Sequence, residues 1–195
     1  MQRTRKKEYV IGIPEEEGSV LGIRLVAELL SRGCNVYVST IGSPSAPDLN
    51  LALSDMQQWM ESFAKKYPDS FQCVEDLSRG GALASLGYDG MVIVPCPKDL
   101  IRQLADGQTD SSLTNYARSC ILQHRPLVLV PRDTPFTTEY LEHMLILSKL
   151  RVAVVPAMLS FSQKNISYEN MIDTIVEKIL DSLNVEKNGK EGAYE

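Results

Sequence analysis

Charged side chains follow a strongly apolar run in the second half of the chain. Residues 127–130, Leu-Val-Leu-Val, contain no polar residue and lead directly into Pro-Arg-Asp-Thr-Pro at residues 131–135. An unbroken apolar run is typical of a parallel strand that helices cover on both faces. Ligands of such sheets bind beyond the carboxyl ends of the strands, so Arg132, Asp133 and Thr134 are candidate site residues. An ion pair at the sheet edge, or a contact between subunits, is the alternative role of Arg132 and Asp133.

A second apolar strand also ends in polar chemistry. Residues 91–94, Met-Val-Ile-Val, stop at Pro95, Cys96, Pro97 and Lys98. A packed thiol is the favoured role of Cys96, because neither of the two histidines lies near it in sequence to activate it as a nucleophile. The four cysteines form no CxxC pair, and the histidines stand among polar neighbours, so we expect no metal site and no disulfide framework.

Strands and helices alternate along the chain. Apolar runs predict strands, and 3.6-residue periodicity predicts helices. The strands are expected at residues 9–13, 35–40, 91–94, 127–130 and 152–155, and the helices at 20–30, 49–67, 100–105, 113–122, 141–150 and 168–183. Gly33 should follow the first helix as its C′ residue, and Trp59 should pack in the core. Four or five parallel strands with helices on both faces make a three-layer, doubly wound α/β fold of the Rossmann-like or flavodoxin-like kind, with a mostly parallel sheet.

Composition limits the classes of partner. The chain has 195 residues, of which 44% are hydrophobic, and this suits one domain over residues 9–185 between a flexible basic tail, 1–8, and a polar tail, 186–195. The formal charge of −5 argues against a nucleic-acid partner. No apolar stretch approaches the roughly 18 residues of a membrane span. We therefore expect a cytoplasmic protein with reduced thiols.

Several segments resemble the UbiX-type flavin prenyltransferases, formerly grouped with the aromatic-acid decarboxylase flavoproteins. The strongest are GMVIVPCPKDL at residues 90–100, RPLVLVPRDTPF at 125–136 and HMLILSKLRVAVVPA at 143–157. The beginning of the chain matches at Gly12, Gly18, Gly22 and Arg24. The resemblance extends over residues 9–185 and implies the fold derived above.

The resemblance also implies an activity and an assembly. Members of the family attach a dimethylallyl group to N5 and C6 of reduced FMN without a metal and supply the product to a UbiD-type decarboxylase. They are homo-oligomers, commonly trimer-based dodecamers, with FMN between subunits. Carried over by resemblance, the catalytic residues are Arg132, Asp133 and Lys178, and the cofactor-binding residues are Gly12, Pro14, Glu17, Gly18, Thr40, Gly80, Gly81, Pro95, Cys96, Pro97, Lys98 and Asn115.

The expected phosphate loop departs from the family pattern. Where the family has a small-residue turn, this chain has Pro14 followed by three glutamates, Glu15, Glu16 and Glu17. The glutamates can be interpreted as acids in the first turn of the following helix, as a loop that rejects phosphate, or as side chains turned outward while FMN binds. Pro97 replaces a serine, Asn115 an arginine and Ser162 a tyrosine. Two further hypotheses therefore stand beside the prenyltransferase: a non-catalytic paralogue that has lost FMN and serves as a structural subunit, assembled with an authentic flavoprotein, and a protein that binds another ligand in the same pocket.

Overall fold

The computed structural model describes residues 5–14, 19–41, 50–74, 87–158 and 167–185. All the statements below refer to these ranges. Of the residues expected at the site, Glu17, Gly18, Gly80 and Gly81 lie outside them, as do Glu15, Glu16 and Ser162.

The described strands form one six-stranded sheet in the order β3-β2-β1-β4-β5-β6, and every neighbouring pair is parallel. They are β1 (Glu8–Pro14), β2 (Asn35–Ile41), β3 (Phe71–Cys73), β4 (Gly90–Cys96), β5 (Leu127–Pro131) and β6 (Ala153–Val154). The sequence predicted four or five strands, which is too few. The missing strand, β3, has only three residues, and Gln72 and Cys73 are exposed, so it lacks the apolar run that marks the central strands.

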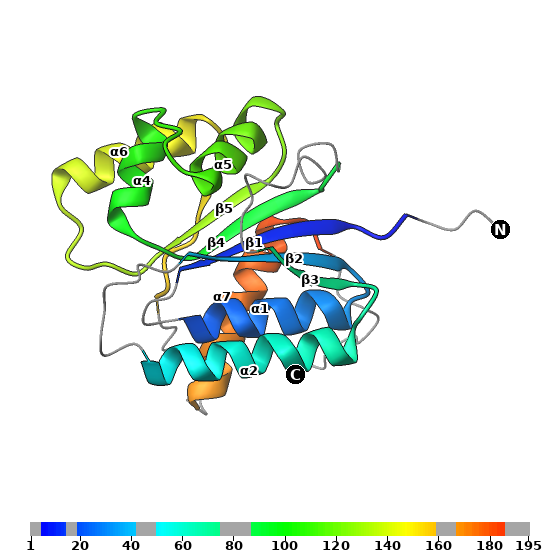
Figure 1. Cartoon of the computed structure of the whole chain (residues 1–195). Coiled ribbons are helices and arrows are strands. Elements are labelled where there is room, and N and C mark those ends of the chain that lie inside the picture. The colour runs from blue at the N-terminus through cyan, green and yellow to red at the C-terminus, as the bar shows by residue number, and fades with distance from the viewer. Residues whose placement is uncertain (1–4, 15–18, 42–49, 75–86, 159–166, 186–195) are drawn as a thin grey trace, which may run out of the picture.

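Six helices in the described ranges complete a three-layer fold, which confirms the predicted class. They are α1 (Ser19–Ser31), α2 (Asn50–Lys66), α4 (Lys98–Ala105), α5 (Ser112–Leu122), α6 (Thr138–Lys149) and α7 (Tyr168–Ser182). Figure 1 shows α1, α2 and α7 on one side of the sheet and α4, α5 and α6 on the other. Each layer packs on the sheet through its own cluster of buried apolar side chains.

Local sequence explains where the helices begin and end. Ser111 begins α5 with a capping box, in which its side chain accepts a hydrogen bond from Thr114 N and its own backbone N–H donates to Thr114 Oγ1. Thr137 and Ser167 cap α6 and α7 through their hydroxyl groups. After α1 the chain turns at Gly33, whose φ of 78° lies in the left-handed region, and this confirms the predicted C′ glycine.

Two expectations need correction, and a third concerns residues outside the described ranges. Trp59 does not pack in the core: it is 49% exposed on α2 and borders a groove of about 420 Å³ with Arg24 and Tyr168. α1 begins at Ser19 and has no acidic residue in its first turn, and Glu15, Glu16 and Glu17 lie outside the described residues, so the three interpretations of their role stay open. The first strand begins one residue earlier than predicted, at Glu8, and the preceding Lys7 Nζ donates to Asn184 O at 2.9 Å.

Candidate functional site

The reversal of strand order places the site at the carboxyl ends of β1 and β4. From β1 the chain continues through α1 to β2 on one side, whereas β4 lies on the other side of β1 and is followed by α4 on the opposite face. Crossovers that leave two adjacent strands for opposite faces open a crevice at their carboxyl ends, where doubly wound proteins bind ligands. In this sheet the switch point lies between Pro14, the last residue of β1, and Cys96, the last residue of β4.

Asp133 connects the ends of β4 and β5. The backbone N–H of Lys98, the first residue of α4, donates to Asp133 Oδ2 at 3.0 Å. Pro97, the N-cap residue, makes no side-chain cap hydrogen bond of its own. Asp133 therefore caps α4 from the next strand, and its negative charge lies at the positive end of the helix dipole.

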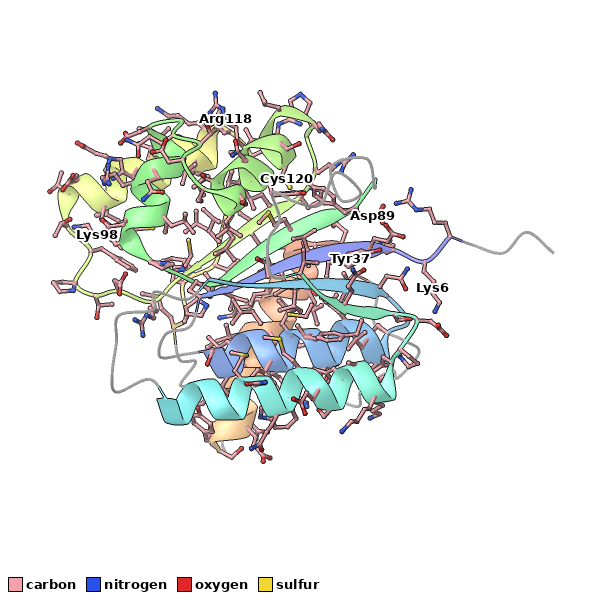
Figure 2. The ribbon with its side chains drawn as sticks, viewed as in Figure 1. Lys6, Tyr37, Asp89, Lys98, Arg118 and Cys120 are labelled. Carbon is pink, nitrogen blue, oxygen red and sulfur yellow. The ribbon has the colours of Figure 1, made fainter. Side chains whose placement is uncertain are left out.

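Two cationic side chains surround this carboxylate. Arg132 Nε lies 4.0 Å from Asp133 Oδ1, and the Lys98 ammonium lies 5.9 Å from the centroid of the Tyr140 ring. Figure 2 shows Lys98 at the end of the molecule where the strands finish, opposite the end marked by Asp89 and Lys6. With Arg132, Asp133 and Lys98 at one edge, the group carries one net positive charge and suits an anionic or polar ligand.

Tyr140 also lies beside this group, although no sequence motif predicted it. Its side chain is buried at the start of α6, and its ring meets Phe136 edge-on at 5.6 Å. Burial raises the pKa of Tyr140, and Cys96 and Asp133 raise it further. Helical periodicity assigns the buried face of α6 to the core, so it does not distinguish Tyr140 from a core residue. Only the position of Tyr140 near the strand ends makes it a candidate for the site.

The predicted residues of β1 and β4 lie mainly in the packed interior. Pro95 and Cys96 are buried within β4, and the Cys96 thiol lies 3.9 Å from Pro97 O, as expected for a packed cysteine. Gly12 is buried in β1, where a Cβ atom would lie 2.8 Å from Leu113 Cδ1, so a larger residue at this position would require the Leu113 side chain to shift. Pro14 pairs with Ile41 at the end of the β1–β2 ladder.

Other predicted residues do not meet the Arg132–Asp133 pair. Lys178 is exposed on α7, which covers the opposite face of the sheet from α4 and α6. Asn115 is exposed on α5 and donates from Nδ2 to Thr109 O at 3.0 Å. Thr40 pairs with Ile13 near the end of β2, beside the β1 terminus.

Among residues 5–14, 19–41, 50–74, 87–158 and 167–185, no group of three His, Cys, Asp or Glu side chains could hold a metal ion. In the same ranges no helix has the length and apolar character to cross a bilayer.

Comparison with known proteins identifies the family. The model of the Flavoprotein family matches residues 2–184. Flavin prenyltransferase UbiX of Halalkalibacterium halodurans is 33% identical over 183 residues, which cover 91% of this chain and 89% of the relative.

Solved structures share the fold. A dodecameric FMN-dependent UbiX-like decarboxylase from Escherichia coli O157:H7 is 22% identical and covers 96% of this chain and 100% of its own, with a TM-score of 0.76. A UbiX structure in complex with FMN and dimethylallyl pyrophosphate gives the same coverage and TM-score at 23% identity. The family model and the H. halodurans relative together show that this chain belongs to the Flavoprotein family and, within it, to the UbiX flavin prenyltransferases.

Proposed function

We propose that this chain is a flavin prenyltransferase that binds FMN at the carboxyl ends of β1 and β4 and joins a dimethylallyl group to reduced FMN. The observation that carries this proposal is the grouping of Lys98, Arg132 and Asp133 at that edge of the sheet. The relationship to a flavin prenyltransferase over most of both chains supports it. So does the fold shared with a UbiX protein that was solved with FMN and dimethylallyl pyrophosphate.

The described residues fit a flavin at this edge. Tyr140 has a buried hydroxyl group that makes no hydrogen bond with any described residue, and Lys98 and Arg132 add positive charge at the same edge. Bound reduced FMN would supply the ring atoms N5 and C6 to which the dimethylallyl group is joined. We assign the neighbouring flavin and phosphate contacts to Gly12, Pro14, Glu17, Gly18, Thr40, Gly80, Gly81, Pro95, Cys96, Pro97 and Asn115.

The charged residues would act on the prenyl donor. As its carbon–oxygen bond breaks, the departing phosphate takes the electron pair, and Arg132 and Lys98 would balance the added negative charge. Removing one preorganised charge of this kind typically lowers kcat by about 10²- to 10³-fold. Asp133 would hold Lys98 at the start of α4 and accept a proton from the prenylated ring.

We also propose that the site is completed in a homo-oligomer. Lys178 is exposed on α7, which covers the opposite face of the sheet from α4, the helix that Asp133 caps, so we assign its role on the prenyl phosphate to a second copy of the chain. The structural neighbour from E. coli is a dodecamer. A cytoplasmic UbiD-type decarboxylase would receive the product.

A flavin-free paralogue, structural or specific for another ligand, is the second candidate function. Pro14 ends β1 without a backbone N–H to offer a phosphate, and three glutamates follow it. A carboxylate about 4 Å from one phosphate charge costs on the order of 4 kcal/mol at an effective dielectric constant near 20. That is roughly a thousandfold in affinity.

FMN binding separates the two candidates. Flavin fluorescence quenching is measured with the native chain, with the variant Glu15→Gly, Glu16→Ala, Glu17→Ser, and with a charge-matched control that replaces the exposed acids Glu61, Asp69 and Asp110. Micromolar or tighter binding by the native chain, followed by formation of prenylated FMN, supports the prenyltransferase. If the loop variant binds FMN while the native chain and the charge-matched control do not, the result contradicts the prenyltransferase and supports the flavin-free paralogue.

A further inference from the structure

Resting on the proposed flavin site, we propose that the Tyr140 hydroxyl group donates a hydrogen bond to an acceptor atom on the ring system of the bound flavin. Tyr140 would then contact the flavin ring, whereas the cationic side chains of Lys98 and Arg132 would contact phosphate. The inference depends on a buried polar group without a partner, on its position, and on its protonation.

The hydroxyl group lacks a partner although it is fully buried. Tyr140 is 1% exposed, and its oxygen accepts from and donates to no described atom. Buried hydroxyl groups are nearly always hydrogen-bonded, because one left unsatisfied loses its water without compensation. Tyr88 in the same apolar cluster shows the usual case: it is 3% exposed, and its hydroxyl lies 3.4 Å from Tyr116 O and 3.7 Å from Cys120 Sγ.

The surroundings of Tyr140 place it at the binding edge. The Lys98 ammonium lies over one part of its ring, and the Phe136 ring contacts it at an interplanar angle of 73°. Lys98 begins α4, two residues after the end of β4, and Phe136 lies in the loop after β5, so both contacts come from segments that follow strand ends. Lys98 is in turn fixed by its backbone hydrogen bond to Asp133. A rigid aromatic group with an unsatisfied hydroxyl at this position suits a ligand contact.

The hydroxyl group can act only as a neutral donor or acceptor. Burial raises the pKa of Tyr140 above its ordinary value, and electrostatic interactions with Cys96 and Asp133 raise it further, so the proton stays on the oxygen at physiological pH. Beside the Asp133 carboxylate, a neutral acceptor such as a ring carbonyl or ring nitrogen avoids charge repulsion. A phosphate at the same place would meet that carboxylate.

The test compares two tyrosine-to-phenylalanine variants that each delete one buried hydroxyl group. Thermal unfolding of the ligand-free protein is measured for the wild type, Tyr140→Phe and Tyr88→Phe, together with the Kd of each for FMN and for riboflavin, which lacks the phosphate. For Tyr140→Phe we expect an unchanged or higher unfolding midpoint and a Kd raised about tenfold for both flavins. For Tyr88→Phe we expect a lower midpoint and unchanged Kd values.

The outcomes separate the inference from the function on which it rests. An unchanged Kd in Tyr140→Phe, with tight binding by the wild type, overturns the inference alone. A lower midpoint for Tyr140→Phe shows that the hydroxyl has a partner within the chain, and weakening for FMN but not riboflavin assigns it to the phosphate; either result overturns the inference. If the wild type binds neither flavin, the proposed function fails, and the inference fails with it.

Discussion

Asp133 shows how one side chain can serve structure and chemistry together. Its Oδ2 atom accepts the first backbone N–H of α4, while Oδ1 lies toward Arg132. A carboxylate in this position stabilises the helix end whether or not a ligand is present. A loss of activity after mutation of Asp133 is therefore informative only if the helix remains capped.

Two substitutions of Asp133 distinguish these roles. Asp133→Ala should lower the free energy of unfolding by about 1 kcal/mol, because α4 loses its cap. Asp133→Asn retains an acceptor for the Lys98 N–H and should change stability by less than about 0.5 kcal/mol. If the charge is needed for prenyl transfer, both variants lose turnover. Urea unfolding and a prenylation assay measure the two effects.

Asp99→Ala is the matched control for Asp133. Asp99 lies in the first turn of the same helix, and its side chain is exposed. This variant should retain both stability and turnover. Wild-type turnover in Asp133→Asn would limit the residue to capping.

At the scale of elements, charged side chains join α1 to α7. Arg32 at the end of α1 is only 8% exposed, and its guanidinium lies 2.6 Å from Glu177 Oε1 and 3.7 Å from Glu28 Oε2. About two turns earlier on α1, Arg24 pairs with Asp173 at 2.8 Å, but both of these side chains are more than 40% exposed. The same pair of helices thus carries one buried and one solvated ion pair.

The two arginines should differ in their contribution to stability. Arg32→Ala leaves Glu177 partly buried without its cation and should cost about 2 to 3 kcal/mol. Arg24→Ala should cost less than about 1 kcal/mol, because solvent screens the exposed pair. Urea denaturation of both variants at low and high salt measures the difference. Equal midpoints for the two variants would contradict this assignment.

Across the whole molecule, two apolar layers are separated by the sheet, and the layer beneath α4, α5 and α6 contains groups that titrate at high pH. Burial raises the pKa of Cys120 on α5 to about 11, although the nearby Tyr88 hydroxyl and Arg125 lower it in part. In the unfolded chain the thiol titrates near 9.0. The folded state therefore binds the proton more tightly, and the resulting stability is complete below pH 9.

Alkaline pH should destabilise the protein through this thiol. As pH rises from 9 to 11, the unfolded chain loses the proton first, and the free energy of unfolding should fall by up to about 3 kcal/mol from Cys120. Cys120→Ser, which does not titrate in this range, should show a shallower decline. Cys73→Ser is the control, because Cys73 is exposed. Denaturant unfolding at each pH gives the slopes, and parallel curves for wild type and Cys120→Ser would contradict the prediction.

How far the sequence predicts this molecule depends on how strongly each segment is buried. The central strands β1, β4 and β5 are buried along nearly their whole length, so their apolar runs identified them. The edge strand β3 is mostly exposed and gives no such pattern. Trp59 lies on the apolar face of α2, yet its side chain is half-exposed. The prediction failed because periodicity shows which face of a helix is apolar but does not show what covers that face.

At the site, the sequence predicts strand ends better than side-chain partners. Arg132, Asp133 and Lys98 follow apolar runs, and the rule for parallel sheets brings them to one edge. The hydrogen bond that the Lys98 N–H donates to Asp133 depends on the register between β4 and β5, which shifts between Ile93 and Cys96. Local sequence patterns predict neither that register nor the absence of a described hydrogen-bond partner for the Tyr140 hydroxyl group.

The hydrogen bond between Lys98 and Asp133 provides a built-in probe of the site. The Lys98 amide proton exchanges with solvent deuterium only when the carboxylate releases it. A ligand that competes for Asp133 Oδ2 should speed deuterium uptake at this one backbone position, and a ligand that closes the strand ends around it should slow uptake. Deuterium uptake at the Lys98 amide can thus report ligand binding at the ends of β1 and β4 before any product is formed.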